Sequence, residues 1–171
     1  MAVSAPEPLA DHHKLGAFDC GTPSLDDWLK RRARANRASG ASRTFIVCDA
    51  DEVVAYYALA SGAISAISAA SASGRFRRNM PEPIPIAVLA RLAVDRAYQG
   101  KGLGRALFQD SALRVLNAAS AIGIRGMIVH AISEDAKAFY AKLGFDPSPL
   151  DAMTLMVTLA DIRLNLRSAE K

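Results

Sequence analysis

The sequence has few features that would place the protein in a membrane or in an oxidising compartment. Cys20 and Cys48 are its only cysteines, too few for a disulfide scaffold. Its longest apolar runs fall short of the roughly 20 residues that a helix needs to cross a bilayer. The first residues lack the basic-then-apolar pattern of a signal peptide. We therefore expect reduced thiols, a cytoplasmic location and no membrane partner.

Several nucleotide, hydrolase and metal motifs are also missing. The phosphate loop G-x-x-x-x-G-K-[ST] does not occur, and the dinucleotide pattern G-x-G-x-x-G fails after Gly102 and Gly104 because Leu107 takes the third glycine's place. No G-x-S-x-G string indicates a serine hydrolase. His12, His13 and His130 form no zinc spacing with the cysteines. We expect no metal.

The chain is long enough for a hydrophobic core. Its 171 residues are 51% hydrophobic and 22% charged, without repeats or a convincing linker. The prediction is a single domain, 1–171, with a core of about 8–160 and a C-terminal tail at 161–171. A net charge of +4 permits a polyanionic partner without requiring one.

Hydrophobic periodicity predicts helices and strands in mixed order. The predicted helices are 24–40, opened by a Ser24/Asp27 capping box and closed by Gly40, then 103–119, and 134–143 ended by Gly144. The predicted strands are 44–48 and 53–60, which form a hairpin, a possible continuation over 61–73, and 86–95, 126–132 and 153–159. A proline-containing loop precedes residue 86. The fold class is α/β (α+β), a mixed central sheet flanked by helices.

The string QGKGLG, residues 99–104, holds three glycines between a predicted strand and a predicted helix. Such a turn presents unpaired N–H groups and the positive end of the helix dipole, which suits a phosphate. Lys101 and Arg105 add positive charge. The pattern Q-x-x-G-x-G, with Gln99, Gly102 and Gly104, is weak by itself, since a glycine cluster is also used in a plain turn.

The segments around this string resemble those of a known family. LAVD before Q-x-x-G-x-G, and AKAFYAKLGF at 136–145, resemble the coenzyme loop and last motif of the GNAT N-acetyltransferase superfamily. With FDCG (18–21) and LDDWL (25–29), the chain from about 8 to 160 is most similar to the tRNA-acetylating toxins of bacterial type II toxin–antitoxin modules.

The resemblance implies a coenzyme site and a catalytic residue. Acetyl-CoA would be held between the strands at 86–95 and 126–132, and Tyr140 matches the catalytic tyrosine beside the thioester sulfur. The residues that would bind the coenzyme are Leu92, Ala93, Val94, Gln99, Gly100, Lys101, Gly102, Leu103, Gly104, Arg105, Ser133, Ala136, Lys137 and Phe139. The alternative for Phe139 is packing in the core, and for Lys101 and Arg105 simple solvation.

Acetyl transfer to an amine needs a neutral nucleophile, an oxyanion donor and a proton for the departing thiolate. A backbone N–H near Val94 can serve the oxyanion, and the Tyr140 phenol can supply the proton. No residue stands out as a general base. An α-amine with a pKa near 8 is already about one-tenth neutral at pH 7, whereas a lysine amine is about one in 10³ neutral. The acceptor is therefore predicted to be an α-amino group.

Arginine and lysine clusters supply a possible link to RNA. The candidates for phosphate contacts are Lys30, Arg31, Arg34, Arg37, Arg75, Arg77, Arg78 and Arg91. The alternative is that these charges are only a solvated face. Few aromatic residues are interleaved, so base stacking is not predicted.

The sequence thus favours a toxin that acetylates the α-amine of aminoacyl-tRNA and blocks translation. The resemblance further implies a homodimer and a ribbon-helix-helix antitoxin, with operator DNA bound only through the antitoxin complex. Two alternatives stay open. One is an acetyltransferase for protein N-termini or small amines, and the other is a non-catalytic DNA-binding corepressor partner.

Overall fold

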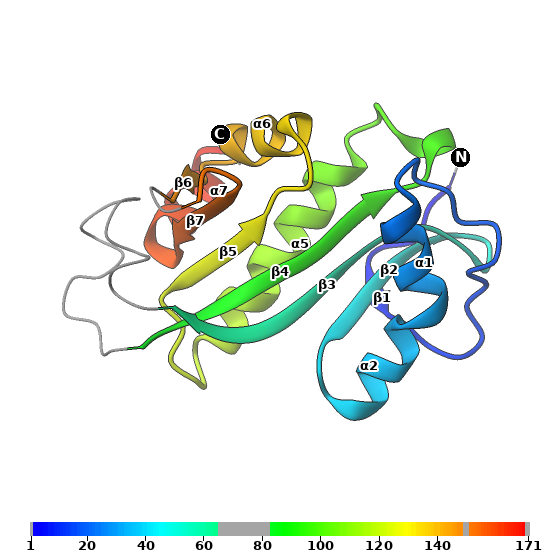
Figure 1. Ribbon diagram of the computed structural model, residues 1–171, viewed down its shortest axis with the longest axis horizontal. Helices are drawn as coiled ribbons and strands as arrows, with labels where there is room; N and C mark the ends of the chain where they lie inside the picture. The colour runs from blue at the N-terminus through cyan, green and yellow to red at the C-terminus, as the bar shows by residue number, and fades with distance from the viewer. Residues whose placement is uncertain (1, 65–82, 149–150, 170–171) are drawn as a thin grey trace. The chain divides into compact units, whose positions relative to one another are not determined.

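The strands form one mixed sheet in the order β1-β2-β3-β4-β5-β7-β6 (Figure 1). The computed structural model describes residues 2–64, 83–148 and 151–169. β4 (Ile84–Val94) and β5 (Gly126–His130) are parallel, whereas β5 pairs with β7 (Thr154–Thr158) in the antiparallel sense. Helices flank the sheet, which confirms the predicted fold class.

The chain divides into two compact units that alternate along the sequence. Unit 1 comprises Met1–Ala60 and Ala90–Ser111, and unit 2 comprises Ser61–Leu89 and Ala112–Lys171. The extent of the single domain, 1–171, stays a prediction.

Unit 1 is built around an antiparallel hairpin. β2 (Arg43–Asp49) and β3 (Glu52–Ile64) pair from Arg43↔Leu59 to Asp49↔Glu52, as predicted, and Ala50 makes the turn with a φ of 55°. The short strand β1 (Glu7–Pro8) adds to the outer edge of β2. The unit also contains the 3-10 turn η1 (Arg96–Tyr98) and the beginning of α5 (Leu103–Ala118).

The predicted helix 24–40 is two helices. α1 (Pro23–Arg31) and α2 (Ala33–Ser39) meet at Arg32, whose φ of −120° interrupts the helical path. The side chain of Arg32, at this break, is exposed to solvent. The predicted capping box is also wrong, because α1 begins after Thr22 with no side-chain cap. Pro23 fits there, since the first helical residue needs no amide hydrogen.

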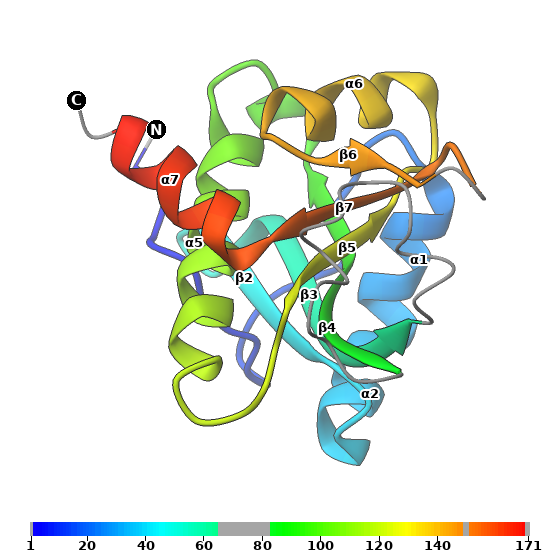
Figure 2. The ribbon, with the colours of Figure 1, turned by 90° about the vertical axis from the view of Figure 1, so that its left-hand side faces the viewer.

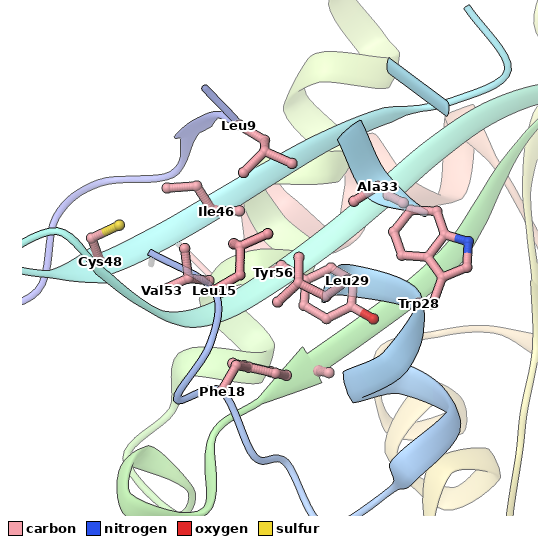
Figure 3. Packing of buried hydrophobic residues seen from close by; sticks show 12 residues of the cluster. Leu9, Leu15, Phe18, Trp28, Leu29, Ala33, Ile46, Cys48, Val53 and Tyr56 are labelled. Atoms are coloured by element: carbon pink, nitrogen blue, oxygen red, sulfur yellow. The ribbon is translucent and has the colours of Figure 1, made fainter. Parts of the chain in front are cut away.

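An aromatic cluster packs α1 on the hairpin (Figure 3). The rings of Trp28 and Tyr56 stack at 5.9 Å, and Phe18 meets Tyr56 edge-on at 5.5 Å. The buried hydroxyl of Tyr56 donates to the carbonyl oxygen of Leu25 at 2.6 Å, so this polar group is satisfied. Burial of these rings fixes α1 against β3.

The N-terminal segment 9–13 is fastened to α2 by arginine side chains. Arg34 Nη2 donates to the carbonyl oxygens of Ala10, Asp11 and His13, the last at 2.6 Å. Arg37 Nη1 donates to the carbonyl oxygen of Leu9. Arg34 and Arg37, which the sequence predicted as RNA contacts, therefore stabilise the fold of unit 1.

Unit 2 contains the parallel strand pair and the C-terminal elements. Ile86↔Gly126 to Leu89↔Val129 set the register of β4 and β5. α6 (Glu134–Lys142) follows β5, and β6 (Asp146–Pro147) pairs with β7. The predicted helices 103–119 and 134–143 and the strand 153–159 match α5, α6 and β7 to within one residue at each end, whereas β5 ends two residues before the predicted 132.

Most of the segment predicted as a C-terminal tail, 161–171, is helical, because α7 (Leu159–Ala169) continues directly from β7 (Figure 2). Thr158 caps this helix, since its Oγ1 accepts a hydrogen bond from the N–H of Asp161 at 3.1 Å. The sequence pattern Thr158-x-x-Asp161 is a helix-start signal that indicates this element.

Two predictions lie partly outside the described residues. The strand continuation over 61–73 is present as far as Ile64, where β3 ends, and the remainder is not described. The loop before residue 86 lies mostly outside as well, together with Arg75, Arg77 and Arg78. Among the described residues, no helix has the length and apolar character required to cross a membrane.

We predict that Arg34→Ala lowers the free energy of unfolding by about 2 kcal/mol, because charged hydrogen bonds to three carbonyls are lost. Thermal or urea unfolding measures the change. The matched control is Arg31→Ala, whose side chain is exposed and which should cost less than about 0.5 kcal/mol. Equal stability of the two variants would contradict this role for Arg34.

Candidate active site

The turn between β4 and α5 requires glycine for its backbone. Gly100 and Gly102 have φ angles of 78° and 83°, a region that L-residues enter only with strain. No heavy atom lies within 4 Å of a Cβ placed on either residue. The glycines are therefore set by the path of the chain, and the space around both residues is open.

In the first turn of α5, the leading N–H groups have no hydrogen-bond partner among the described residues. The N–H of Ala106 donates to the carbonyl oxygen of Gly102 at 3.1 Å and opens the helical ladder. The N–H groups of Leu103, Gly104 and Arg105 precede this bond and have no partner within the helix. Together with the helix dipole they form a site suited to a phosphate.

Two exposed cations flank this helix start. Lys101 Nζ lies 5.6 Å from the ring centroid of Tyr98, and Arg105 is in the first turn of α5. Tyr98 is itself anchored, because its hydroxyl donates to Asp49 Oδ2 at 2.5 Å. The positive charge therefore stands next to the free N–H groups.

Gln99 positions the turn through its side chain. Its Nε2 donates to the carbonyl oxygens of Val94, at 2.8 Å, and Cys20, at 3.0 Å. Its own N–H donates to the carbonyl oxygen of Arg96 at 3.4 Å. The backbone N–H of Gln99, a residue predicted to bind the coenzyme, is therefore already paired within the turn.

Asp95 completes the connection at the end of β4. Its carboxylate accepts from the N–H groups of Ala97 and Asp19, both at 3.0 Å. Of the three β4 residues predicted to bind the coenzyme, Ala93 is buried in the core of unit 1, and Leu92 and Val94 are half-buried.

The FDCG string lies against this connection. Asp19 pairs with Arg96, Oδ1 to Nε at 3.2 Å, and the N–H of Cys20 donates to Asp26 at 2.9 Å. Burial and then Asp26 raise the pKa of Cys20 to about 11, so the thiol is protonated at neutral pH. Cys20 is thus a structural residue of the turn rather than a nucleophile.

In unit 2, α6 carries Tyr140, whose ring packs against two other aromatic rings. Phe139 and Phe145 meet the Tyr140 ring edge-on, at 5.1 and 5.7 Å. The side chain is buried, which raises the pKa of its phenol above the ordinary value. No described residue forms a hydrogen bond with the hydroxyl. Tyr140 is therefore a protonated donor throughout the physiological pH range.

The other predicted α6 residues occupy the start and the sides of the helix. Ser133 is the N-cap, and its Oγ accepts from the N–H of Ala136 at 3.1 Å. Ala136, Lys137 and Phe139 are half-buried. Two acidic residues in the first turn, Glu134 and Asp135, complement the helix dipole.

A hydrogen-bonded chain that the sequence did not reveal lies at the end of β5. Thr154 Oγ1 donates to Asp151 Oδ2 at 2.9 Å and lies 2.9 Å from His130 Nδ1. These three polar residues line a cavity of about 290 Å³. The rest of its lining is formed by residues 62–64, four apolar strand residues and Ser148. The sequence signal is the pairing of His130 with Thr154 on neighbouring strands, and it becomes visible only when the strand register is known.

One group of side chains has metal-ligand chemistry. Ligand atoms of Glu7, His13 and Cys48 lie within 4.8 Å of one another. His13 Nδ1 accepts a hydrogen bond from the N–H of Ala10, and His13 Nε2 therefore carries the proton that faces Glu7 Oε1, both at 2.9 Å. Because both ring nitrogens are used and burial raises the pKa of Cys48 to about 11, the trio does not fit a metal ion.

The remaining candidates for RNA contacts differ in their surroundings. Lys30 and Arg31 are exposed at the end of α1. The guanidinium of Arg91 lies over the ring of Trp28, 4.4 Å from its centroid. Arg34 and Arg37 are bound to backbone carbonyls as described above, so the charge available to an RNA on this part of unit 1 is smaller than the sequence suggested.

The fold and the glycine turn agree with a family match. Residues 40–147 match the acetyltransferase (GNAT) domain model. The chain therefore belongs to the GNAT acetyltransferase family. A tRNA-acetylating toxin of Mycobacterium tuberculosis is 47% identical over 160 residues, covering 94% of this chain and 95% of the relative.

Solved structures with the same fold include ligand complexes. AtaT complexed with acetyl-methionyl-tRNAfMet has a TM-score of 0.86 and 30% identity, covering 96% of this chain and 99% of that one. A mutant AtaT toxin bound to acetyl-CoA and to the C-terminus of the antitoxin AtaR has a TM-score of 0.81 and 29% identity, covering 96% and 97%.

Gly104→Ala should affect stability and ligand binding in opposite directions. Gly104 lies in the first turn of α5 without a positive φ, so alanine should stabilise the helix by up to about 1 kcal/mol. The added methyl group obstructs a phosphate at the adjacent N–H groups and should weaken acetyl-CoA binding about tenfold or more. Thermal unfolding and calorimetric titration measure the two effects. A stabilised variant with unchanged affinity would exclude the turn as the phosphate site.

Proposed function

We propose that this protein is a toxin that transfers the acetyl group of acetyl-CoA to the α-amino group of aminoacyl-tRNA and so blocks translation. The observation that carries the proposal is the glycine turn after β4, which opens the N–H groups of α5 to a phosphate. Family membership and the tRNA-acetylating relative support the choice of coenzyme and acceptor.

In this proposal the coenzyme lies along Leu92–Val94, with its diphosphate on the first turn of α5. Gly102 and Gly104 allow close approach of the diphosphate, and Lys101 and Arg105 neutralise its charge. Gln99 holds the turn in place through its two carbonyl contacts. Ser133, Ala136, Lys137 and Phe139 of the α6 segment are the proposed contacts for the rest of the coenzyme.

Tyr140 acts as the donor to the leaving sulfur. Burial keeps its phenol protonated, so a proton is available when the C–S bond breaks. The raised pKa also means that full transfer to a thiolate of ordinary pKa, about 8.5, is uphill. Tyr140 therefore stabilises the developing thiolate by a hydrogen bond and completes the transfer as the products form.

The acceptor follows from amine chemistry and from charge. At pH 7 about one-tenth of an α-amine is unprotonated and can act as a nucleophile, whereas only about one in 10³ lysine side chains is unprotonated. Lys30, Arg31 and Arg91 offer positive charge for the phosphates of the tRNA end, and Arg75, Arg77 and Arg78 remain candidates from the sequence.

We further propose the cellular setting of a toxin–antitoxin pair. The protein would form a homodimer and bind a ribbon-helix-helix antitoxin, and that complex would bind operator DNA. The AtaT complex with the C-terminus of its antitoxin AtaR supports an antitoxin partner. Charged tRNA and acetyl-CoA are cytoplasmic, and so is the proposed site of action.

The decisive experiment is incubation of the purified protein with labelled acetyl-CoA and total charged tRNA, followed by mass spectrometry of the released amino acids. Acetylated amino acids are expected. Label on protein N-termini would instead select a protein acetyltransferase, and absence of any transfer by folded protein that binds acetyl-CoA would select a binding module.

Tyr140→Phe should lower kcat by about 10²-fold or more, because the proton donor is lost. The phenyl ring keeps its contacts with Phe139 and Phe145, and no described residue loses a hydrogen bond, so the melting temperature should hold. Single-turnover kinetics and thermal unfolding measure both. Wild-type kcat would remove Tyr140 from the mechanism.

A double variant, Lys30→Ala with Arg31→Ala, tests the RNA face of α1. If both side chains contact phosphates, the slope of log affinity against log salt should become shallower by about 1–2, at 0.7–0.9 for each contact. Lys142→Ala with Arg163→Ala removes the same charge elsewhere and should change the slope less. An equal slope for both double variants would show that only net charge matters.

A further inference from the structure

The cavity at the end of β5 combines an apolar floor with one polar wall. The floor is formed by strand residues of even number, whose side chains point to one face of the sheet: Ile86, Val88, Ile128 and Met156. Gly62 closes the side, where a Cβ would lie 3.1 Å from Val88. The cavity is at the lower end of the size range of small-ligand sites.

His130, Thr154 and Asp151 form the polar wall, and their hydrogen bonds fix one tautomer. The single proton of the Thr154 hydroxyl is donated to Asp151 Oδ2. Thr154 Oγ1 can therefore only accept from His130, so Nδ1 carries a proton. In the neutral ring, Nε2 is then left with a lone pair. This is the arrangement in which a histidine accepts protons, with a hydroxyl and a carboxylate behind it.

Asp151, the last residue of this hydrogen-bonded series, is held in its ionised form. Hydrogen bonds from the Met153 N–H and the Thr154 hydroxyl, with a contribution from His130, lower the pKa of Asp151 below its usual range. Among the described residues that line the cavity, Asp151 and His130 are the only titratable ones. Asp151 therefore places a negative charge behind Thr154, on the Nδ1 side of the His130 ring.

The wall and Tyr140 belong to the same unit and to successive elements. β5 ends at His130, Ser133 caps the following helix, and α6 carries Tyr140 (Figure 1). One short connection thus joins a proton acceptor to the proposed proton donor.

We propose that His130 is the general base of the reaction, and that the apolar floor receives the side chain of the aminoacyl group. The inference rests on the proposed function and adds the base that the sequence did not supply. Thr154 and Asp151 act as positioning residues, because Thr154 contacts His130 and Asp151 acts on His130 only through Thr154.

The amine nitrogen forms a bond to the thioester carbon and gives one proton to His130 Nε2. The C–S bond breaks, and the thiolate takes the proton of the Tyr140 hydroxyl. His130 returns its proton to solvent and Tyr140 regains one, so thioester and amine become amide and thiol.

The pH dependence separates a base from a structural residue. Near pH 7 part of an α-amine is protonated, and loss of His130 removes the acceptor for its proton. Above pH 9 the amine is neutral, and solvent hydroxide takes over proton removal. We expect His130→Gln to lower kcat/KM by about 10²-fold at pH 7 and by less than tenfold at pH 9.

The substrate for this test is tRNA that carries its amino acid through a stable amide, because the natural ester hydrolyses at high pH. Single-turnover acetylation is measured from pH 6 to 9 for wild type, His130→Gln and Thr154→Val. Thr154→Val keeps the shape of the wall and should give an intermediate loss with the same pH trend. Added imidazole should restore activity to His130→Ala. His12→Gln removes an exposed histidine and should match wild type.

The outcomes distinguish this inference from the proposed function. If wild-type protein does not acetylate charged tRNA, the proposed function fails first. If wild-type protein does, but His130→Gln keeps wild-type kcat/KM or loses the same factor at every pH without imidazole rescue, His130 is not the base. Unfolding curves for each variant show whether a lost rate reflects a lost fold.

Discussion

The side-chain amide of Gln99 holds two backbone carbonyls where β4 gives way to the glycine turn. One carbonyl belongs to the strand end and the other to the FDCG turn at the start of α1. Asp95 reinforces the same junction by accepting from Asp19 and Ala97. With these bonds in place, the turn can adopt positive φ angles and deliver the first N–H groups of α5 to open space. The proposed coenzyme site therefore depends on side chains that need not touch the coenzyme.

The order of strands and helices could be predicted, because the hydrophobic periodicity of each segment indicates its type and glycines mark several of the element ends. The strand of β4, the turn at 99–104 and α5 follow from an apolar run, a glycine cluster and a 3.6-residue period. The break at Arg32 could not be predicted, since the helical sequence pattern continues across it. α7 could have been found from the cap at Thr158, but its mixed polarity resembles a tail.

The candidate site was predictable where one segment supplies it and hidden where separate segments meet. The phosphate turn is contiguous in sequence, so its glycines could be recognised. The chain from His130 to Asp151 joins residues twenty-one positions apart, and it depends on the register of β5 with β7. The roles of Arg34 and Arg37 were hidden for the same reason. The sequence of a basic helix is the same whether its arginines contact an RNA or donate to backbone carbonyls of their own chain.

Both thiols have pKa values of about 11, one in the FDCG turn and the other beside Glu7. At pH 7 only about one thiol in 10⁴ is ionised, and the thiolate is the form that peroxides and alkylating reagents attack. Both cysteines should therefore react slowly with peroxides and alkylating reagents at neutral pH.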